Sequence, residues 1–416
     1  MAKNTLSTAI ISQNSTFNES AASPWLLKLV LFWMVGCIIS GKSFAYLSLG
    51  PIYITEGVMI CLILQNFKKL TISDLWFFIF IFFYIIVGAF KYNNFFMVLK
   101  DTSILYYLSF VRFFPRNFPQ KYLKIAMAAV GITLCLSSLG LVGVQLLPLA
   151  GKYEAGVSLM AFAFYVYQKR GNRFEIGSLM FFIMMALLLN FKTLIICFGI
   201  LPVLGRVKPI VAWFFKPWKM TVLSFCVLAM IGFGYAKEVT KFPVYLLSSI
   251  TDATIGRSYS TDTASWRVRI WESGVSNLMR DKQVLFGTFP GFNFINVKFL
   301  NLKIRDRNAI EPRDGGSLGG ANRLAHNFLV QLIMKFGIVG VAFFFVFLTK
   351  FQGVASKNLL LFETSILLLA ATSGLLEVPS SGPLFYSFLI ALKSNENQSE
   401  IVKKRSDLPL ALHPST

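Results

Sequence analysis

Runs of apolar residues alternate with short, mostly basic loops along nearly the whole chain. Because about twenty apolar residues in a helix cross a bilayer, this pattern predicts about twelve membrane-spanning helices. We expect them near Trp25–Ser40, Ile52–Leu64, Leu75–Phe90, Val98–Phe113, Ile125–Leu147, Ala155–Tyr167, Ile176–Asn190, Leu194–Leu204, Met220–Tyr235, Phe328–Leu348, Leu359–Leu375 and Leu384–Leu392. The predicted fold class is all-α, a polytopic membrane protein with one long hydrophilic loop.

The composition agrees with a membrane domain. Apolar residues make up 55% of the chain, charged residues make up 14%, and the mean hydropathy is +0.63. A soluble protein carries about a quarter charged residues. All five cysteines fall in apolar runs without the spacing of metal ligands, which argues against disulfides and zinc.

The distribution of charge predicts the orientation. The net charge of +21 could suggest nucleic-acid binding, but most of it lies in alternate short loops such as Lys68–Lys69, Arg112–Lys124 and Lys169–Arg173. By the positive-inside rule these loops are cytoplasmic, and so are both termini. The same reasoning places residues 237–325 on the outer side.

The chain then divides into five parts. A polar N-terminus covers residues 1–24, without the basic-then-apolar pattern of a cleaved signal. Spanning helices follow over 25–236, then the outer loop over 237–325, further helices over 326–392 and a basic tail over 393–416. Within the outer loop we expect turns at Gly287–Gly291 and a mobile stretch from Lys303 to Arg323.

His326 is one of two histidines, and the other, His413, lies in the polar tail. It directly precedes the apolar run from Phe328, so it is expected at the outer N-terminus of a helix. The free amides and positive dipole end there favour neutral imidazole, which can accept a proton. Gly337 and Gly340 would let a neighbouring helix approach closely. The simpler interpretation is that His326 only marks the start of a helix.

Arg267 and Trp271 lie four residues apart and would share a helical face, whereas Arg269 would point elsewhere. A guanidinium beside an indole suits a phosphate or a sugar. Such a helix could equally lie on anionic lipid as an anchor, and taken alone it favours that interpretation.

Several charged residues fall at membrane depth, where a charge is costly and usually faces a cavity or a partner. Lys192 and the neighbours Lys100 and Asp101 are expected at outer ends of helices. The alternative for each is structural pairing. The full set is Glu56, Lys100, Asp101, Lys192, Lys335, Glu363 and Glu377.

An outer vestibule built from these residues would hold one histidine, several cations and few acids. That suits an anionic, lipid-linked substrate, with protein cations stabilising a pyrophosphate leaving group. The sequence offers no cluster of acids or histidines that would hold a metal.

The segment His326-Asn327, nine residues, Gly337, two residues, Gly340 resembles the signature of bacterial O-antigen ligases and related surface-polysaccharide polymerases. Arg267 with Trp271 resembles the motif that opens the large periplasmic loop of that family. The motifs cover about Thr261 to Gly340, and the topology covers the whole chain.

The resemblance implies a GT-C-like glycosyltransferase that needs no metal, nucleotide or other cofactor. It would move a glycan from undecaprenyl pyrophosphate to an acceptor hydroxyl at the periplasmic face of the bacterial inner membrane. His326 would be the catalytic base or would orient the acceptor, and Arg267 would bind the pyrophosphate. The substrate-binding candidates are Arg269, Lys192, Asn327, Arg323, Lys100 and Trp271.

The chain departs from the family pattern at three places. Lys192 stands where many relatives have arginine, and Lys335 occupies a position that is often acidic. A Gly-x-Gly expected in the loop is replaced by Gly287-Thr-Phe-Pro-Gly291. These departures affect the substrate class more than the chemistry.

Three functions remain open at this point. The first is a ligase that attaches a finished glycan to lipid A-core, and the second is a polymerase of lipid-linked repeat units. The partners in both are an undecaprenyl-pyrophosphate-linked glycan, an acceptor glycolipid or glycan, and membrane lipid, with no nucleic acid. The third is a flippase or transporter, which the lack of an internal repeat makes the remotest of the three.

Overall fold

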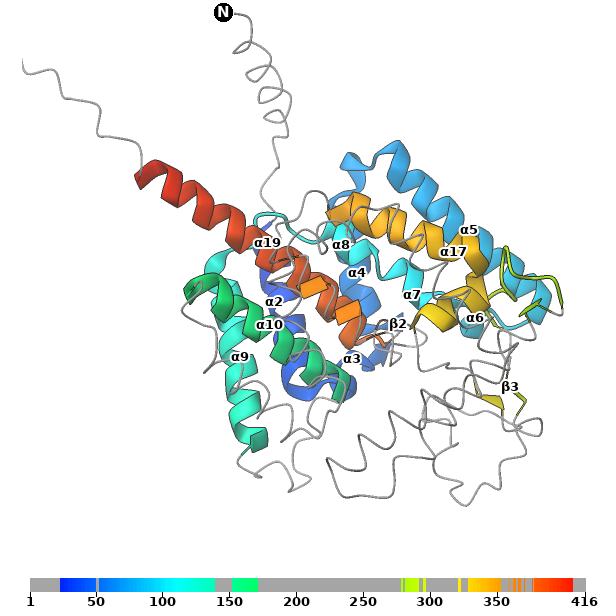
Figure 1. The fold of residues 1–416 in the computed structure, drawn as a ribbon, viewed down its shortest axis with the longest axis horizontal. Coiled ribbons are helices and arrows are strands. Elements are labelled where there is room, and N and C mark those ends of the chain that lie inside the picture. The colour runs from blue at the N-terminus through cyan, green and yellow to red at the C-terminus, as the bar shows by residue number, and fades with distance from the viewer. Residues whose placement is uncertain are drawn as a thin grey trace, which may run out of the picture.

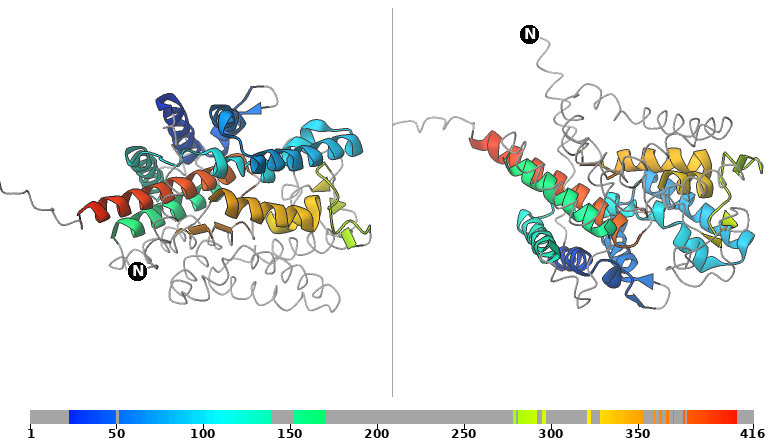
Figure 2. Two further views of the ribbon diagram at one scale, coloured as in Figure 1. Left: turned by 90° about the horizontal axis from the view of Figure 1, so that it is seen from above. Right: turned by 60° about the horizontal axis from the view of Figure 1, so that its bottom comes forward.

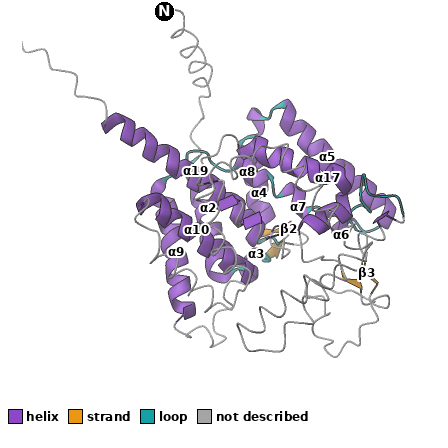
Figure 3. Cartoon of the chain, in the orientation of Figure 1, coloured by secondary structure: helices purple, strands orange, loops and turns teal. Residues whose placement is uncertain are grey.

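The computed structural model describes residues 23–49, 52–138, 152–170, 281–291, 328–352 and 378–406, with short pieces at 278–279, 295–296, 321–322 and within 359–376. These residues are mostly helical, as predicted (Figure 3). The expected spans at 176–190, 194–204 and 220–235 lie outside the described residues.

One group of helices combines residues from the N-terminal part of the chain, up to residue 170, with the C-terminal helix α19. Helix α2 packs on α9 and α4, and α10 packs on α9 and α19. Figures 1 and 2 show α10 and α19 running side by side along their length. Each helix includes an apolar run, and α19 continues past the predicted span Leu384–Leu392 through the mostly polar residues 393–406 of the predicted tail. The bounds are α2 Pro24–Ser40, α4 Ile54–Gln65, α9 Gln120–Ser138, α10 Lys152–Arg170 and α19 Ser381–Ser406.

The second group is the pair α5 (Ile72–Tyr92) and α17 (Phe328–Gln352). Aromatic rings hold the two together, and those of Phe80 and Phe343 stack with centroids 3.7 Å apart. Within the described part, these two helices are long and apolar enough to cross a membrane. The outer face of α5 is exposed and apolar, with Leu75, Trp76, Ile79, Phe82, Phe83, Ile86 and Phe90. A continuous apolar face of this kind favours contact with lipid.

The predicted fourth span, Val98–Phe113, is not one helix. It is divided into α6 (Phe95–Asp101), α7 (Ser103–Tyr106) and α8 (Ser109–Phe113). The hydroxyl of Thr102 donates to the carbonyl of Val98 at 2.7 Å, a contact that bends helices. The bend lets α6 lie against α5, while α8 reaches α4, α17 and α19.

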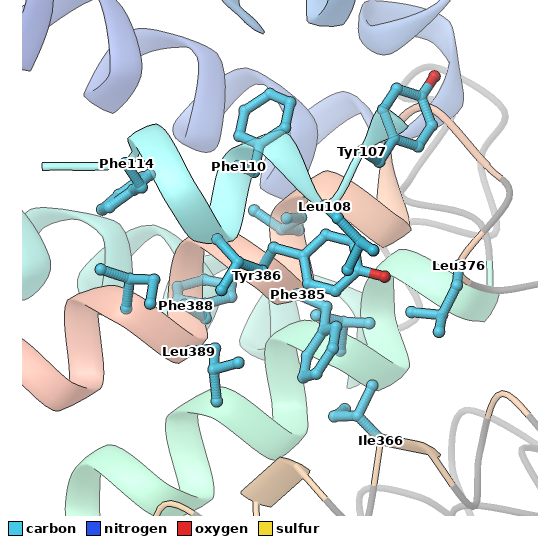
Figure 4. Close-up of a cluster of buried hydrophobic side chains, with 14 of the residues drawn as sticks. Tyr107, Leu108, Phe110, Phe114, Ile366, Leu376, Phe385, Tyr386, Phe388 and Leu389 are labelled. Atoms are coloured by element: carbon cyan, nitrogen blue, oxygen red, sulfur yellow. The ribbon is translucent and has the colours of Figure 1, made fainter. Parts of the chain in front are cut away.

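Segment 107–114 links the two groups through the apolar core. Figure 4 shows Leu108, Phe110 and Phe114 on one side of this core, with Tyr386 and Phe388 of α19 on the other. All five side chains are buried. Because α8 also contacts α17, this core joins the end-of-chain group to the α5–α17 pair.

The remaining elements are short. Strands β1 (Ser48–Leu49) and β2 (Ile52–Tyr53) form an antiparallel hairpin after α3 (Lys42–Ala45). The turn η1 (Phe67–Lys69) joins α4 to α5. Strands β3 (Ile295–Asn296) and β4 (Ala321–Asn322) pair antiparallel, which brings two distant parts of the predicted outer loop together.

Basic residues predicted to be cytoplasmic gather where α5 begins and α17 ends. Lys350 Nζ lies 2.6 Å from the Ser73 hydroxyl. The side chains of Arg116 and Lys393 donate to the last carbonyls of α17, those of Phe351 and Gln352. Burial, and then the nearby charge of Arg116, lower the pKa of Lys393. The opposite ends of both helices carry the residues predicted to face outward.

Candidate functional site

Helix α17 is broken at Gly337, where φ is 65° and ψ is −166°. The break separates Phe328–Phe336, the outer half-helix in the predicted orientation, from the half that continues to Gln352. A broken helix releases amides and carbonyls that must find partners, because a membrane interior offers no water to satisfy them.

The turn at residues 284–291 fills the break with its own backbone. The amides of Ile338 and Val339 donate to the carbonyls of Val284 and Leu285, at 3.0 and 3.1 Å. In the other direction, the amides of Thr288 and Phe289 donate to the carbonyls of Met334 and Lys335, at 2.8 and 3.1 Å. In Figure 1 this turn is the yellow-green segment beside α6, at the ends of α5 and α17.

Two glycines make this approach possible. A Cβ on Gly337 would lie 2.3 Å from the carbonyl oxygen of Leu285, and a Cβ on Gly287 would lie 2.5 Å from the carbonyl carbon of Lys335. Gly287 also has a positive φ, of 75°. The sequence-based prediction that Gly337 and Gly340 admit a neighbouring helix is wrong: the close neighbour of Gly337 is this turn, and that of Gly340 is Phe336 of α17 itself.

A buried ion pair lies directly beside the break. Lys335 Nζ is 2.6 Å from Asp101 Oδ1, and the lysine side chain is 0% exposed. Lys335 Nζ makes a close ion pair here and no hydrogen bond among the described residues. The second carboxylate oxygen, Asp101 Oδ2, accepts from the amide of Gly291 at 2.8 Å. The pair therefore connects α6, α17 and the turn at residues 284–291.

The end of α5 contacts the same turn from the other side. Both Lys91 Nζ and the Tyr92 hydroxyl donate to the carbonyl of Thr288. The buried Tyr84 hydroxyl donates to the carbonyl of Phe336, the last residue before the break, at 2.8 Å. Phe289 adopts a left-handed φ of 70°, which is costly for a bulky residue. A strained residue persists only where many contacts fix it, as they do here.

Of the predicted site residues, the structure describes Lys100. It is exposed on α6, next to Asp101, and its Nζ lies 5.4 Å from the ring centre of Tyr53. His326 and Asn327 stand in the sequence just before Phe328, where α17 begins. The residues outside the described part are Arg267, Arg269, Trp271, Lys192, Arg323, His326 and Asn327.

Another charged residue at membrane depth, Glu56, has a structural role. Its carboxylate accepts from the Tyr106 hydroxyl at 2.5 Å and from the amide of Tyr53 at 3.0 Å, where α4 begins. This is the pairing that the simpler interpretation predicted. Among the described residues, no group of histidines, cysteines and acids could hold a metal ion.

The ion pair and the inserted loop were not predicted as one site. The sequence carries two signals for it: the glycine- and proline-rich turn at residues 287–291, and a lysine in the middle of an apolar helix. A charge at that depth requires a partner. The sequence alone does not identify the partner, because Asp101 and Lys335 are far apart along the chain.

Comparison with family models, curated proteins and solved structures finds no match for this chain.

Proposed function

We propose that the chain is an integral-membrane glycosyltransferase of the O-antigen ligase type, acting at the periplasmic face of the bacterial inner membrane. It would transfer a glycan from undecaprenyl pyrophosphate to a hydroxyl of lipid A-core, without metal or nucleotide. The observation that carries the proposal is that two features of the expected signature fall in α17. The described part of α17 starts at Phe328, next to His326-Asn327 in the sequence, and the helix breaks at Gly337, the first glycine of the family-like signature.

The chemistry requires a base and a clamp for the leaving group. In the proposed reaction the acceptor oxygen forms a bond to the anomeric carbon while the bond from that carbon to the pyrophosphate oxygen breaks. His326 accepts the proton of the acceptor hydroxyl. Arg267, assisted by Lys192, stabilises the charge on undecaprenyl pyrophosphate as it leaves.

The role of His326 is tested with purified protein and a lipid-linked glycan donor. We expect His326→Ala to lower the release of undecaprenyl pyrophosphate by about 100-fold or more, the usual contribution of a positioned base. His413→Ala is the matched control, because it removes the other histidine of the chain. Wild-type turnover by a well-folded His326→Ala protein would reject the base.

A repeat-unit polymerase uses the same chemistry with a lipid-linked glycan as acceptor. The lipopolysaccharide of a deletion strain distinguishes the two enzymes. Loss of long chains from lipid A, with polymer still on undecaprenyl, identifies the ligase. Single repeat units attached to lipid A identify the polymerase.

The broken helix also raises the possibility of a flippase or transporter, because transporters bind substrates at half-helix ends. The contacts at this break argue against that use. The amides of Ile338 and Val339 and the carbonyls of Met334, Lys335 and Phe336 are taken up by the protein itself. A donor that is moved across the membrane without any release of undecaprenyl pyrophosphate would instead favour transport.

A further inference from the structure

The outer half-helix of α17 needs an external support. The break at Gly337 interrupts the hydrogen-bond ladder that would otherwise fix Phe328–Phe336 rigidly to the rest of α17. A free helix of nine residues is unstable alone, since isolated helices shorter than about twelve residues are marginal. Its direction is therefore set by its surroundings: the packing that buries most of its side chains, and the polar contacts with the turn at 284–291, the Tyr84 hydroxyl and Asp101.

The ion pair is the most demanding of these supports. Lys335 is 0% exposed and its partner carboxylate on Asp101 is 9% exposed, so both groups have lost nearly all of their water. Desolvating such a pair costs about as much as its mutual attraction returns, and apolar residues of similar size often serve stability equally well. The pair is therefore poorly explained by stability alone, whereas its fixed geometry suits a positioning role.

The geometry of the pair connects three elements. Lys335 lies on the outer half-helix, and Asp101 ends α6. Gly291 ends the inserted turn, and its backbone N–H donates a hydrogen bond to Asp101 Oδ2. Moving any one of these elements separates the two charges or removes a partner from a buried carboxylate. An arrangement of this kind has one favoured geometry.

We propose that Lys335 and Asp101 are positioning residues for the transfer reaction, holding the half-helix that follows His326-Asn327 in register with the inserted turn. This inference rests on the proposed function. Lys335 does not bind the donor pyrophosphate in this arrangement, because its ammonium is fully buried and already faces a carboxylate. The pair acts on the reaction through the orientation of the half-helix.

The first measurement is steady-state transfer by four variants: K335M, D101L, the double variant K335M/D101L and K335R. Misplacement of a reacting group by about 1 Å can cost about 100-fold in rate. We expect the first three to lower kcat at least about 10-fold, with KM for the donor nearly unchanged, as for an interaction needed in the transition state. K335R keeps the charge and should recover most of kcat.

The matched control is a second ion pair, Asp74 with Arg112, at the opposite end of α5. The double variant D74N/R112M removes an ion pair far from the inserted turn, with a buried carboxylate and a guanidinium that is 25% exposed. It should keep the wild-type kcat per folded molecule. If K335M/D101L also keeps the wild-type kcat, the positioning role is overturned while the glycosyltransferase proposal stands.

The second measurement does not depend on transfer. Thr288 is 3% exposed in the turn, so Thr288→Cys, in a chain whose native cysteines are replaced, should react slowly with a maleimide. Adding K335M/D101L should raise the alkylation rate at least about 10-fold even where the global stability is unchanged, since local opening of the turn controls the exposure of residue 288. An unchanged alkylation rate overturns the inference. An inactive wild-type protein rejects the proposed function, and the alkylation rates then decide whether the pair holds the turn.

Discussion

Replacing Gly337 with alanine tests the broken helix most directly. The residue has φ 65° and ψ −166°, a region that is essentially restricted to glycine and costs about 1–3 kcal/mol for other residues. An added Cβ would also lie 2.3 Å from the Leu285 carbonyl oxygen and 2.5 Å from the Gly287 amide nitrogen. These neighbours are backbone atoms, so they cannot rotate away as a side chain could.

The structural cost follows from how far the turn must move. The Cβ at 2.3 Å has to reach at least 3.0 Å, so the turn must shift by about 0.7 Å (3.0 − 2.3). That shift weakens the bonds from the amides of Ile338 and Val339 to the turn. Each buried group left unpaired costs about 1–3 kcal/mol. With the backbone strain, the loss is on the order of 5 kcal/mol, comparable with the whole stability of many domains.

The assay is thermal aggregation in detergent: the protein is heated, and the fraction that remains monodisperse is measured at each temperature. Gly57→Ala is the control, because Gly57 lies inside α4 with no atom within 4 Å of its added Cβ. The control should match the wild type or gain about 1 kcal/mol from better helix propensity. If Gly337→Ala were as heat-resistant as Gly57→Ala, the backbone pairing at the break would be wrong.

Two further predictions concern single contacts and use the same heating assay. Tyr84→Phe removes the hydroxyl that donates to the Phe336 carbonyl at 2.8 Å, and we expect a loss of about 1–2 kcal/mol because a buried carbonyl is left unpaired. An unchanged midpoint would mean that this bond contributes nothing. Asp74→Asn removes the charge that Arg112 contacts at 2.5 and 2.8 Å. We expect a loss of about 2–3 kcal/mol, less than for a fully buried pair because the guanidinium is partly exposed. Restoration of the midpoint by D74N/R112M would attribute the loss to the unpaired charge, whereas no loss in Asp74→Asn would reject the contribution of the pair.

Much of the helical pattern could be predicted from the sequence, because apolar runs fix where helices form in a membrane. The expected span Leu75–Phe90 lies within α5, and the expected span Phe328–Leu348 lies within α17. The division of Val98–Phe113 could not be predicted in this way. The first break lies at Thr102, whose hydroxyl bonds to the Val98 carbonyl, and an average over an apolar window does not detect such a single contact.

The candidate site, too, was predictable only in part. That a lysine at membrane depth needs a partner followed from its cost, and Lys335 has one in Asp101. That a turn from the predicted outer loop would enter the break could not be deduced, because its hydrogen bonds join residues about fifty positions apart and leave no periodic pattern. The roles of His326 and Arg267 stay predictions, since both residues lie outside the described part.

The two glycines of the signature therefore have a physical meaning different from the expected helix–helix packing. Gly337 is required by its positive φ and by the backbone of the turn, and a Cβ on Gly340 would lie 2.0 Å from the Cβ of Phe336, across the break. Both glycines thus serve the shape of the broken helix and need no contact with a substrate. It follows that the glycine spacing identifies an architecture, whereas the chemistry must come from the residues on either side of it. A variant at Gly337 should therefore lose stability and activity together, whereas a variant at His326 should lose activity alone.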